Sequence, residues 1–119
     1  MKVNNYRDLA VWQRSLEIAH TIRQSTLAFP KHETFGLASQ IQRAAVSIPA
    51  NIAEGCGRRG RTELRQFLYV SRGSASELEY FLLLARDLRM LDPAKHRQAE
   101  TELLEIKRML AALPQRIGP

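Results

Sequence analysis

The sequence lacks the features that mark most secreted and membrane proteins. It has one cysteine, Cys56, so no internal disulfide can form, which favours a reducing cytoplasm. No apolar run approaches the roughly 20 residues that cross a bilayer, and residues 1–12 show no signal-peptide pattern. No stretch alternates with the period of two that a half-buried strand requires. The 119 residues therefore predict one all-α domain, residues 1–119, in the cytoplasm.

Catalytic and metal-binding motifs are also missing. The patterns CxxC, GxxxxGK[ST] and HExxH do not occur, and Glu17–His20 is a single ExxH where a di-iron bundle uses two. His20, His32 and His96 fall on different segments, and we interpret each as a solvated residue. Cys56 has basic neighbours that would lower its pKa, but the simpler interpretation is a partly buried bystander. We expect no catalytic residue, no metal and no cofactor; a small enzyme acting through Glu54 or Cys56 is the weakest alternative.

The chain instead carries four amphipathic segments. They are expected as helices at about residues 8–28, 33–54, 62–90 and 93–113. Asp8 suits the first helix start, Gly55 the C′ position of the second helix, and Thr62 the N-cap of the third. Asp92–Pro93 is a helix start signal, and we expect Pro114 and Gly118 to end the fourth helix. Short connections between long amphipathic helices predict an antiparallel up-down-up-down four-helix bundle.

The expected inward faces follow helical spacing. In the first expected helix they are Leu9, Trp12, Leu16 and Ala19, with Ile18 and Ile22 beside them, and in the second Leu37, Ile41, Ala44, Ile48 and Ile52. In the third they are Phe67, Ser71, Ser74, Leu78, Phe81, Ala85 and Leu88, and in the fourth Ala99, Leu103, Ile106, Leu110 and Leu113. Ser71 and Ser74 are small, so another helix can approach closely there.

Residues 40–55, QIQRAAVSIPANIAEG, combine an apolar face with a polar line. The line contains Gln40, Arg43, Ser47, Asn51 and Glu54, and Pro49 interrupts the segment. Short hydrogen-bonding groups suit a packed polar contact, in which each donor needs a partner. We expect Glu54 and Glu77 to accept hydrogen bonds from Arg43, Asn51 or the serines, either within the bundle or across a subunit contact.

Positive charge is concentrated after this segment. The net charge is +6, and 14 of the 18 basic residues are arginines, which hold phosphate bidentately. Residues 55–61, GCGRRGR, and the following helix carry the densest patch: Arg58, Arg59, Arg61, Arg65 and Arg72, with Tyr69 among them. Arginines that meet phosphates around an aromatic that stacks on a base are typical of RNA binding. The alternative interpretation is a solvated loop and helix face.

The segment QIQRAAVSIPANIAEG closely resembles the signature of the four-helix-bundle proteins encoded by intervening sequences in bacterial 23S rRNA genes. YRDLAVWQRSLEIAH, FPKHETFGL and FLYVSRGSASELEYFLLLARDL extend the resemblance over about residues 6–113. The chain is also similar to the accessory variability determinant of diversity-generating retroelements, a pentameric barrel that binds nucleic acid and a reverse transcriptase. The resemblance implies a homopentamer without catalysis or cofactor. It further implies that the bundle and its assembly are shaped by Arg43, Ser47, Pro49, Asn51, Glu54 and Gly55, together with Ser74 and Glu77.

Two functions stay open on the sequence. The first is a non-enzymatic oligomeric scaffold that binds nucleic acid, RNA rather than DNA, through the basic loop and the third helix. The second is a protein-interaction adaptor, for example for a reverse-transcriptase-like partner. Both use the same basic face, so the residues alone do not separate them.

Overall fold

The computed structural model describes residues 5–117 and confirms an all-α, four-helix fold. The long helices are α1 (Ala10–Thr26), α2 (Leu37–Cys56), α3 (Arg61–Asp87) and α4 (Pro93–Ile117). Two single-turn 3₁₀ helices precede α1 and α2: η1 (Tyr6–Asp8) and η2 (Lys31–Glu33). Residues 5–117 contain no strand.

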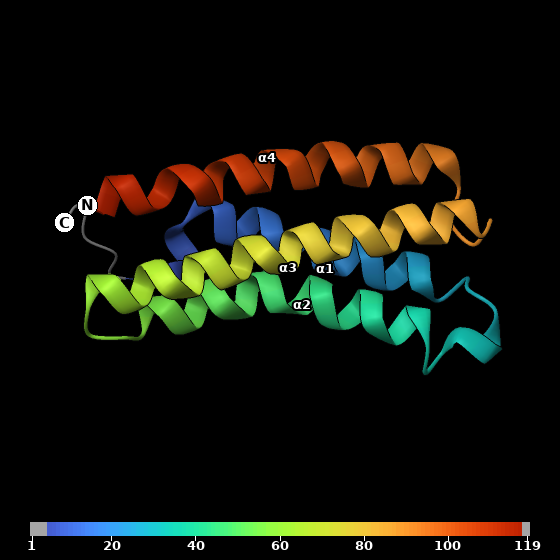
Figure 1. Cartoon of the computed structure of the whole chain (residues 1–119), viewed down its shortest axis with the longest axis horizontal. Helices are drawn as coiled ribbons and strands as arrows, with labels where there is room; N and C mark the ends of the chain where they lie inside the picture. Colours follow the sequence, from blue (N-terminus) through green and yellow to red (C-terminus); the bar gives the residue numbers. More distant parts are fainter. Residues whose placement is uncertain (1–4, 118–119) are drawn as a thin grey trace.

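The helices run side by side along the long axis of a 45 × 24 × 19 Å bundle (Figure 1). Each helix packs against its neighbour in the sequence, and α4 closes the bundle against α1. The α2–α3 connection lies at one end of the bundle, and the α1–α2 and α3–α4 connections lie at the other end (Figure 1). This arrangement is the predicted up-down-up-down order, and it places the arginine-rich loop at one tip of the molecule.

Apolar stripes from all four helices form one core. The predicted stripes of α2 and α4 are buried, apart from the partly exposed Leu37. The stripes predicted for α1 and α3 were only partly right: Ile18, Ile22, Ser71, Leu78 and Ala85 are buried as expected, whereas other predicted positions are half-buried or exposed. In α1 the core side carries Val11, Ser15, Ile18 and Ile22, while Leu16 is 36% exposed. In α3 it includes Leu64, Leu68 and Leu82, whereas Leu88 is 54% exposed and Phe67, Ser74 and Phe81 are half-buried.

The helix starts differ from the sequence expectation where 3₁₀ turns intervene. Asp8 ends η1, and α1 begins at Ala10 after an extended Leu9. Glu33 lies in η2, and its carboxylate accepts a hydrogen bond from the Leu37 backbone N–H at 2.9 Å. That bond satisfies one of the amides that a helix start leaves unpaired, so a side chain four residues upstream caps α2.

Glycine and proline positions explain the other differences. Gly55 is not a C′ residue, because α2 continues to Cys56 and has Gly57 as its C-cap. Thr62 is not the N-cap of α3, since Gly60 takes that position with no side-chain cap. Pro93 is the first residue of α4, as expected, and α4 runs past the buried Pro114 to Ile117. Pro114 is tolerated because it lies near the end of α4, where the missing N–H removes one backbone hydrogen bond of the last turns. Gly118, expected to help end this helix, lies outside the described residues.

Helices α2 and α3 approach each other closely through small residues. A Cβ atom placed on Gly55 would lie 2.8 Å from the Cβ of Phe67. The buried Ser71 hydroxyl donates to the carbonyl of Ile48 at 2.8 Å. These contacts keep the start of α3, and therefore the loop that precedes it, in a fixed position against the end of α2.

Candidate nucleic-acid interface

Arg58 holds the α2–α3 loop together. Its guanidinium contacts Glu54 at 2.9 Å and Glu63 at 3.8 Å, and it lies over the Phe67 ring at 5.0 Å from the ring centroid. These contacts bridge the last turn of α2 and the first turn of α3. Two carboxylates offset its charge, so Arg58 shapes the loop and is less available to a phosphate than the sequence suggested.

The neighbouring arginines differ in their exposure and in the contacts that they make within the protomer. Arg59 is exposed in the loop, and no hydrogen bond or ion pair engages it among residues 5–117. Arg61 is the exposed first residue of α3. Arg65 is half-buried, and its Nε donates to the carbonyl of Pro114 at 3.4 Å, which ties α3 to the end of α4. Arg65 therefore keeps only part of its guanidinium for a ligand.

Further along α3, an aromatic side chain stands beside the exposed arginines. Tyr69 is 57% exposed, and Arg72 is exposed with no charged partner in the described chain. Arg65, Tyr69 and Arg72 are spaced by four and three residues, so they lie on adjacent positions of one helix side. The structure thus brings Arg59, Arg61, Arg65, Tyr69 and Arg72 to one end and side of the bundle. The arrangement offers separate cations around an open ring face.

One arginine of α4 lies level with Arg72 along the bundle. Because α4 runs antiparallel to α3, the Arg65–Pro114 contact aligns the two helices. Arg72 lies seven residues from Arg65, and the exposed Arg108 lies six residues from Pro114, so both are on the order of 10 Å from that contact. Arg108 follows Glu105 by one turn, and Glu105 pairs with Arg14 of α1, so we do not count Arg108 among the residues of the α3 face.

The polar line of α2 is satisfied partly within the bundle. The hydroxyls of Ser47 and Ser74 are 2.8 Å apart across α2 and α3, and Asn51 Nδ2 donates to the carbonyl and hydroxyl of Ser47. The expected partners of the two acids are not found there. Glu54 pairs with Arg58 instead, because its side chain leaves α2 one turn before the loop. Glu77 and Arg43 are exposed, and within residues 5–117 neither makes a hydrogen bond or ion pair.

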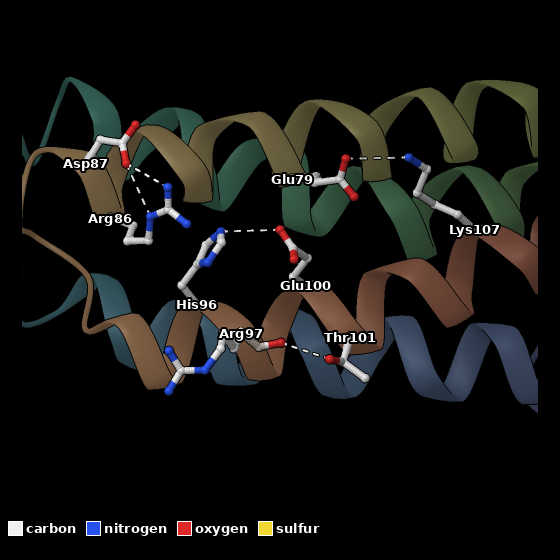
Figure 2. Close-up of polar contacts among 8 residues, drawn as sticks. All are labelled: Glu79, Arg86, Asp87, His96, Arg97, Glu100, Thr101 and Lys107. Atoms are coloured by element: carbon white, nitrogen blue, oxygen red, sulfur yellow. Dashed lines mark hydrogen bonds and ion pairs between the residues drawn. The ribbon is translucent and has the colours of Figure 1, made fainter.

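The structure corrects the prediction for one histidine. His96 is 2% exposed rather than solvated, because it faces the core at the start of α4. Its Nε2 lies 3.7 Å from Glu100, while Nδ1 has no partner (Figure 2). The charged neighbours in the same view pair elsewhere: Arg86 with Asp87, and Glu79 with Lys107. No hydroxyl or thiol nucleophile contacts His96 through any hydrogen bond in the described chain.

Cys56 lies half-buried in the last turn of α2. Desolvation by burial raises the pKa of the Cys56 thiol, so the basic neighbours do not make it a ready thiolate. Residues 5–117 contain no group of three histidine, cysteine, aspartate or glutamate side chains that could hold a metal ion. Among the helices described, none combines the length and apolar character that crossing a membrane requires.

Comparison with known proteins agrees with this architecture. A crystal structure of a protein of unknown function from the S23 ribosomal protein family of Bacteroides thetaiotaomicron is similar, with a TM-score of 0.82 and 25% sequence identity. The similarity covers 88% of this chain and 95% of that chain. No functionally curated protein matches the sequence. The family model for 23S rRNA-intervening sequence proteins matches residues 7–112, and the chain belongs to that family.

Proposed function

We propose that this protein is a non-enzymatic, oligomeric scaffold that binds nucleic acid, RNA rather than DNA. The carrying observation is the exposed ring of Tyr69, with Arg65 and Arg72 on the same side of α3 and Arg59 in the adjoining loop. Unpaired bases stack on exposed aromatic rings while arginines contact the phosphates on either side. Bases that can be splayed out and stacked on a side chain are typical of single-stranded RNA, which favours RNA as the ligand class.

We assign the predicted residues to two roles. Arg59, Arg61, Arg65, Tyr69 and Arg72 would contact the ligand. Arg58 would keep the loop in shape through Glu54, Glu63 and Phe67. A cytoplasmic location is part of the proposal, since Cys56 is the single cysteine.

Fluorescence anisotropy with a labelled single-stranded RNA over a range of salt concentrations tests this function. Arg59→Ala and Arg72→Ala should each weaken binding and reduce the salt slope by about 1, because one phosphate contact is lost. Arg97→Ala is the matched control, since Arg97 is an exposed arginine near the start of α4, at the other end of the bundle. Equal effects of Arg72→Ala and Arg97→Ala would contradict the assigned face.

Tyr69 gives a sharper measurement on the same site. Tyr69→Ala should cost about 1–3 kcal/mol of binding free energy, as expected for the loss of one stacked base. Tyr69→Phe keeps the ring and should bind nearly as well as the wild type. Loss of binding in both variants would assign Tyr69 a hydrogen-bonding role and would contradict stacking.

The oligomeric part of the proposal includes a homopentamer, and it is supported by unpaired charge on the outer faces of α2 and α3. Arg43 and Glu77 make no ion pair within the described protomer although both are exposed. Light scattering coupled to size exclusion, at low and high salt, measures the mass. A monomeric mass at all concentrations would contradict this part.

The second candidate, an adaptor for another protein, is favoured by the exposed apolar residues Val70 and Tyr80 on α3. A complex that survives nuclease treatment and high salt would support the adaptor and weigh against the nucleic-acid scaffold.

A further inference from the structure

The outer side of α3 carries a second stripe that no contact within the protomer explains. Val70, Gly73, Glu77 and Tyr80 follow each other at intervals of three, four and three residues. This is the spacing with which one helix packs against another. Val70 is 52% exposed and Tyr80 is 58% exposed, and Glu77 has no partner among residues 5–117. We call these four residues the α3 stripe.

Gly73 is the least expected member of the α3 stripe. Glycine in a helix interior destabilises the helix relative to alanine, so its presence needs a reason. At Gly55 the reason is the close contact with Phe67, but a Cβ atom at Gly73 would meet nothing within 4 Å. Packing inside the protomer therefore does not require a glycine at position 73. A glycine on an exposed helix face lets the backbone of another molecule approach closely.

A surface of suitable shape lies between α1 and α2. This α1/α2 groove encloses about 230 Å³ and is lined by the apolar side chains of Leu16, Ala19, Val46 and Pro49. Val46 is 59% exposed, so the groove is uncovered in the protomer. His20, Arg23 and Gln42 supply its polar side. The groove thus combines an apolar floor with a cationic edge.

The α3 stripe and the α1/α2 groove are compatible in length and charge. Val70 to Tyr80 spans ten residues, on the order of 15 Å, and Gln42 to Pro49 spans seven residues, on the order of 10 Å, so the stripe is long enough to cover the groove. The stripe carries one carboxylate, Glu77, and the groove carries the guanidinium of Arg23. The stripe is thus an apolar surface with a single acid, and the groove is an apolar surface with a cation.

We propose that the α3 stripe of one copy of this chain packs into the α1/α2 groove of a second copy, with Glu77 facing Arg23. The two surfaces are different, so the contact is heterologous, and repeating it produces a ring when the rotation closes. Arg59 and Arg72 lie outside both surfaces and stay available to nucleic acid. The inference rests on the oligomeric part of the proposed function and specifies which surfaces make the contact.

Disulfide trapping tests the heterologous geometry directly. In a Cys56→Ser background, Val46→Cys and Gly73→Cys are prepared separately, mixed and oxidised. A disulfide forms only where the Cα atoms come within about 7 Å, so the mixture should yield a covalent dimer of the two variants and neither variant alone should do so. A mixture containing Gly73→Cys and Arg97→Cys is the control. Efficient linkage of Gly73→Cys to itself, or no linkage in the Val46→Cys mixture, would overturn the proposal.

Assembly of substituted proteins gives an independent measurement. Gly73→Gln fits the open space of the protomer, so it should fold, but it should raise the dissociation constant of the assembly at least tenfold. Thr101→Gln, on the exposed side of α4, should leave the constant unchanged. Glu77→Arg and Arg23→Glu should each weaken assembly, and the double variant should restore most of it. Normal assembly of Gly73→Gln would exclude the α3 stripe.

The same samples separate this inference from nucleic-acid binding. If RNA binding is retained and depends on Arg59 and Arg72 while Gly73→Gln assembles normally, the contact is wrong and the proposed ligand stands. If the assembly follows the prediction but no RNA binds, the contact stands and the nucleic-acid function fails. A wild-type protein that stays monomeric overturns the contact whatever its RNA binding.

Discussion

Helices α2 and α3 are held together differently from helices α1 and α4. The α2–α3 pair uses small residues and buried polar bonds: Gly55 against Phe67, and Ser71 against the Ile48 carbonyl. The α1–α4 pair has a bidentate but exposed ion pair between Arg14 and Glu105, with N–O distances of 2.9 and 3.0 Å. Two surface grooves open along the same two helices, one around Ile18 and Ala99, the other around Leu9 and Met109.

This difference indicates where the bundle tolerates change. Close packing in the interior responds to the addition of single atoms, whereas an exposed ion pair contributes little to stability. The α2–α3 pair also carries the arginine-rich loop between its helices. We therefore expect mutations at the α2–α3 contact to have large effects on stability and mutations at the α1–α4 contact to have small ones.

The largest expected effect is that of Gly55→Ala, compared with the same substitution at Gly73. At position 55 the new Cβ would lie 2.8 Å from the Cβ of Phe67, and overpacking of this kind costs about 1–3 kcal/mol. At position 73 the new Cβ would meet nothing within 4 Å. The higher helix propensity of alanine should therefore raise the free energy of unfolding there, by at most about 1 kcal/mol. Denaturant unfolding of dissociated protomers measures both values, since assembly adds its own contribution. Equal changes at the two positions would show that α2 and α3 do not approach this closely.

Ser71 provides the next test, with a smaller effect. Ser71→Ala removes the hydroxyl that donates to Ile48 and should lower the free energy of unfolding by about 1 kcal/mol. The Ile48 carbonyl stays inside α2 and is not left unpaired, which limits the loss. Ser76→Ala, on the exposed side of the same helix, should change stability by less than about 0.5 kcal/mol. An equal effect at both serines would mean that the buried bond contributes nothing measurable.

The same contrast explains what sequence reasoning achieved for the fold. The inward stripes of α2 and α4 were predicted because Ile41, Ile48, Leu103 and Ile106 recur at helical spacing with no competing apolar face. In α3, Phe67 and Leu88 also lie at helical spacing, although Phe67 packs at the edge of the core beside Gly55 and Leu88 is exposed, and they drew the prediction away from Leu64, Leu68 and Leu82. Periodicity identifies an apolar face but cannot choose between two.

Helix ends and the candidate site were predicted less completely for a related reason. Gly55 looked like a helix end, yet it is the point of closest approach to α3, and that is a tertiary constraint. The cluster of arginines was visible in the sequence, but the engagement of Arg58 by two carboxylates, and the contact of Arg65 with the Pro114 carbonyl, depend on how the helices are aligned. Composition predicts that a basic surface exists, and packing decides which cations are free.

Substitutions at the α1–α4 contact should have the smallest effect on stability, and that effect should depend on pH. The hydrogen bond and the charge attraction between Arg14 and Glu105 lower the pKa of Glu105 and raise the pKa of Arg14. A carboxyl group whose pKa is lowered by folding contributes stability above its ordinary pKa, and the contribution is lost as the pH falls through the folded value. Glu105→Gln should therefore slightly reduce the melting temperature at neutral pH, with a difference from the wild type that shrinks in acid and in high salt. An Arg14→Gln/Glu105→Gln double-mutant cycle isolates the pair. A difference that stays constant as the pH falls would contradict the ion pair and would leave apolar packing as the contact that holds α4 against α1.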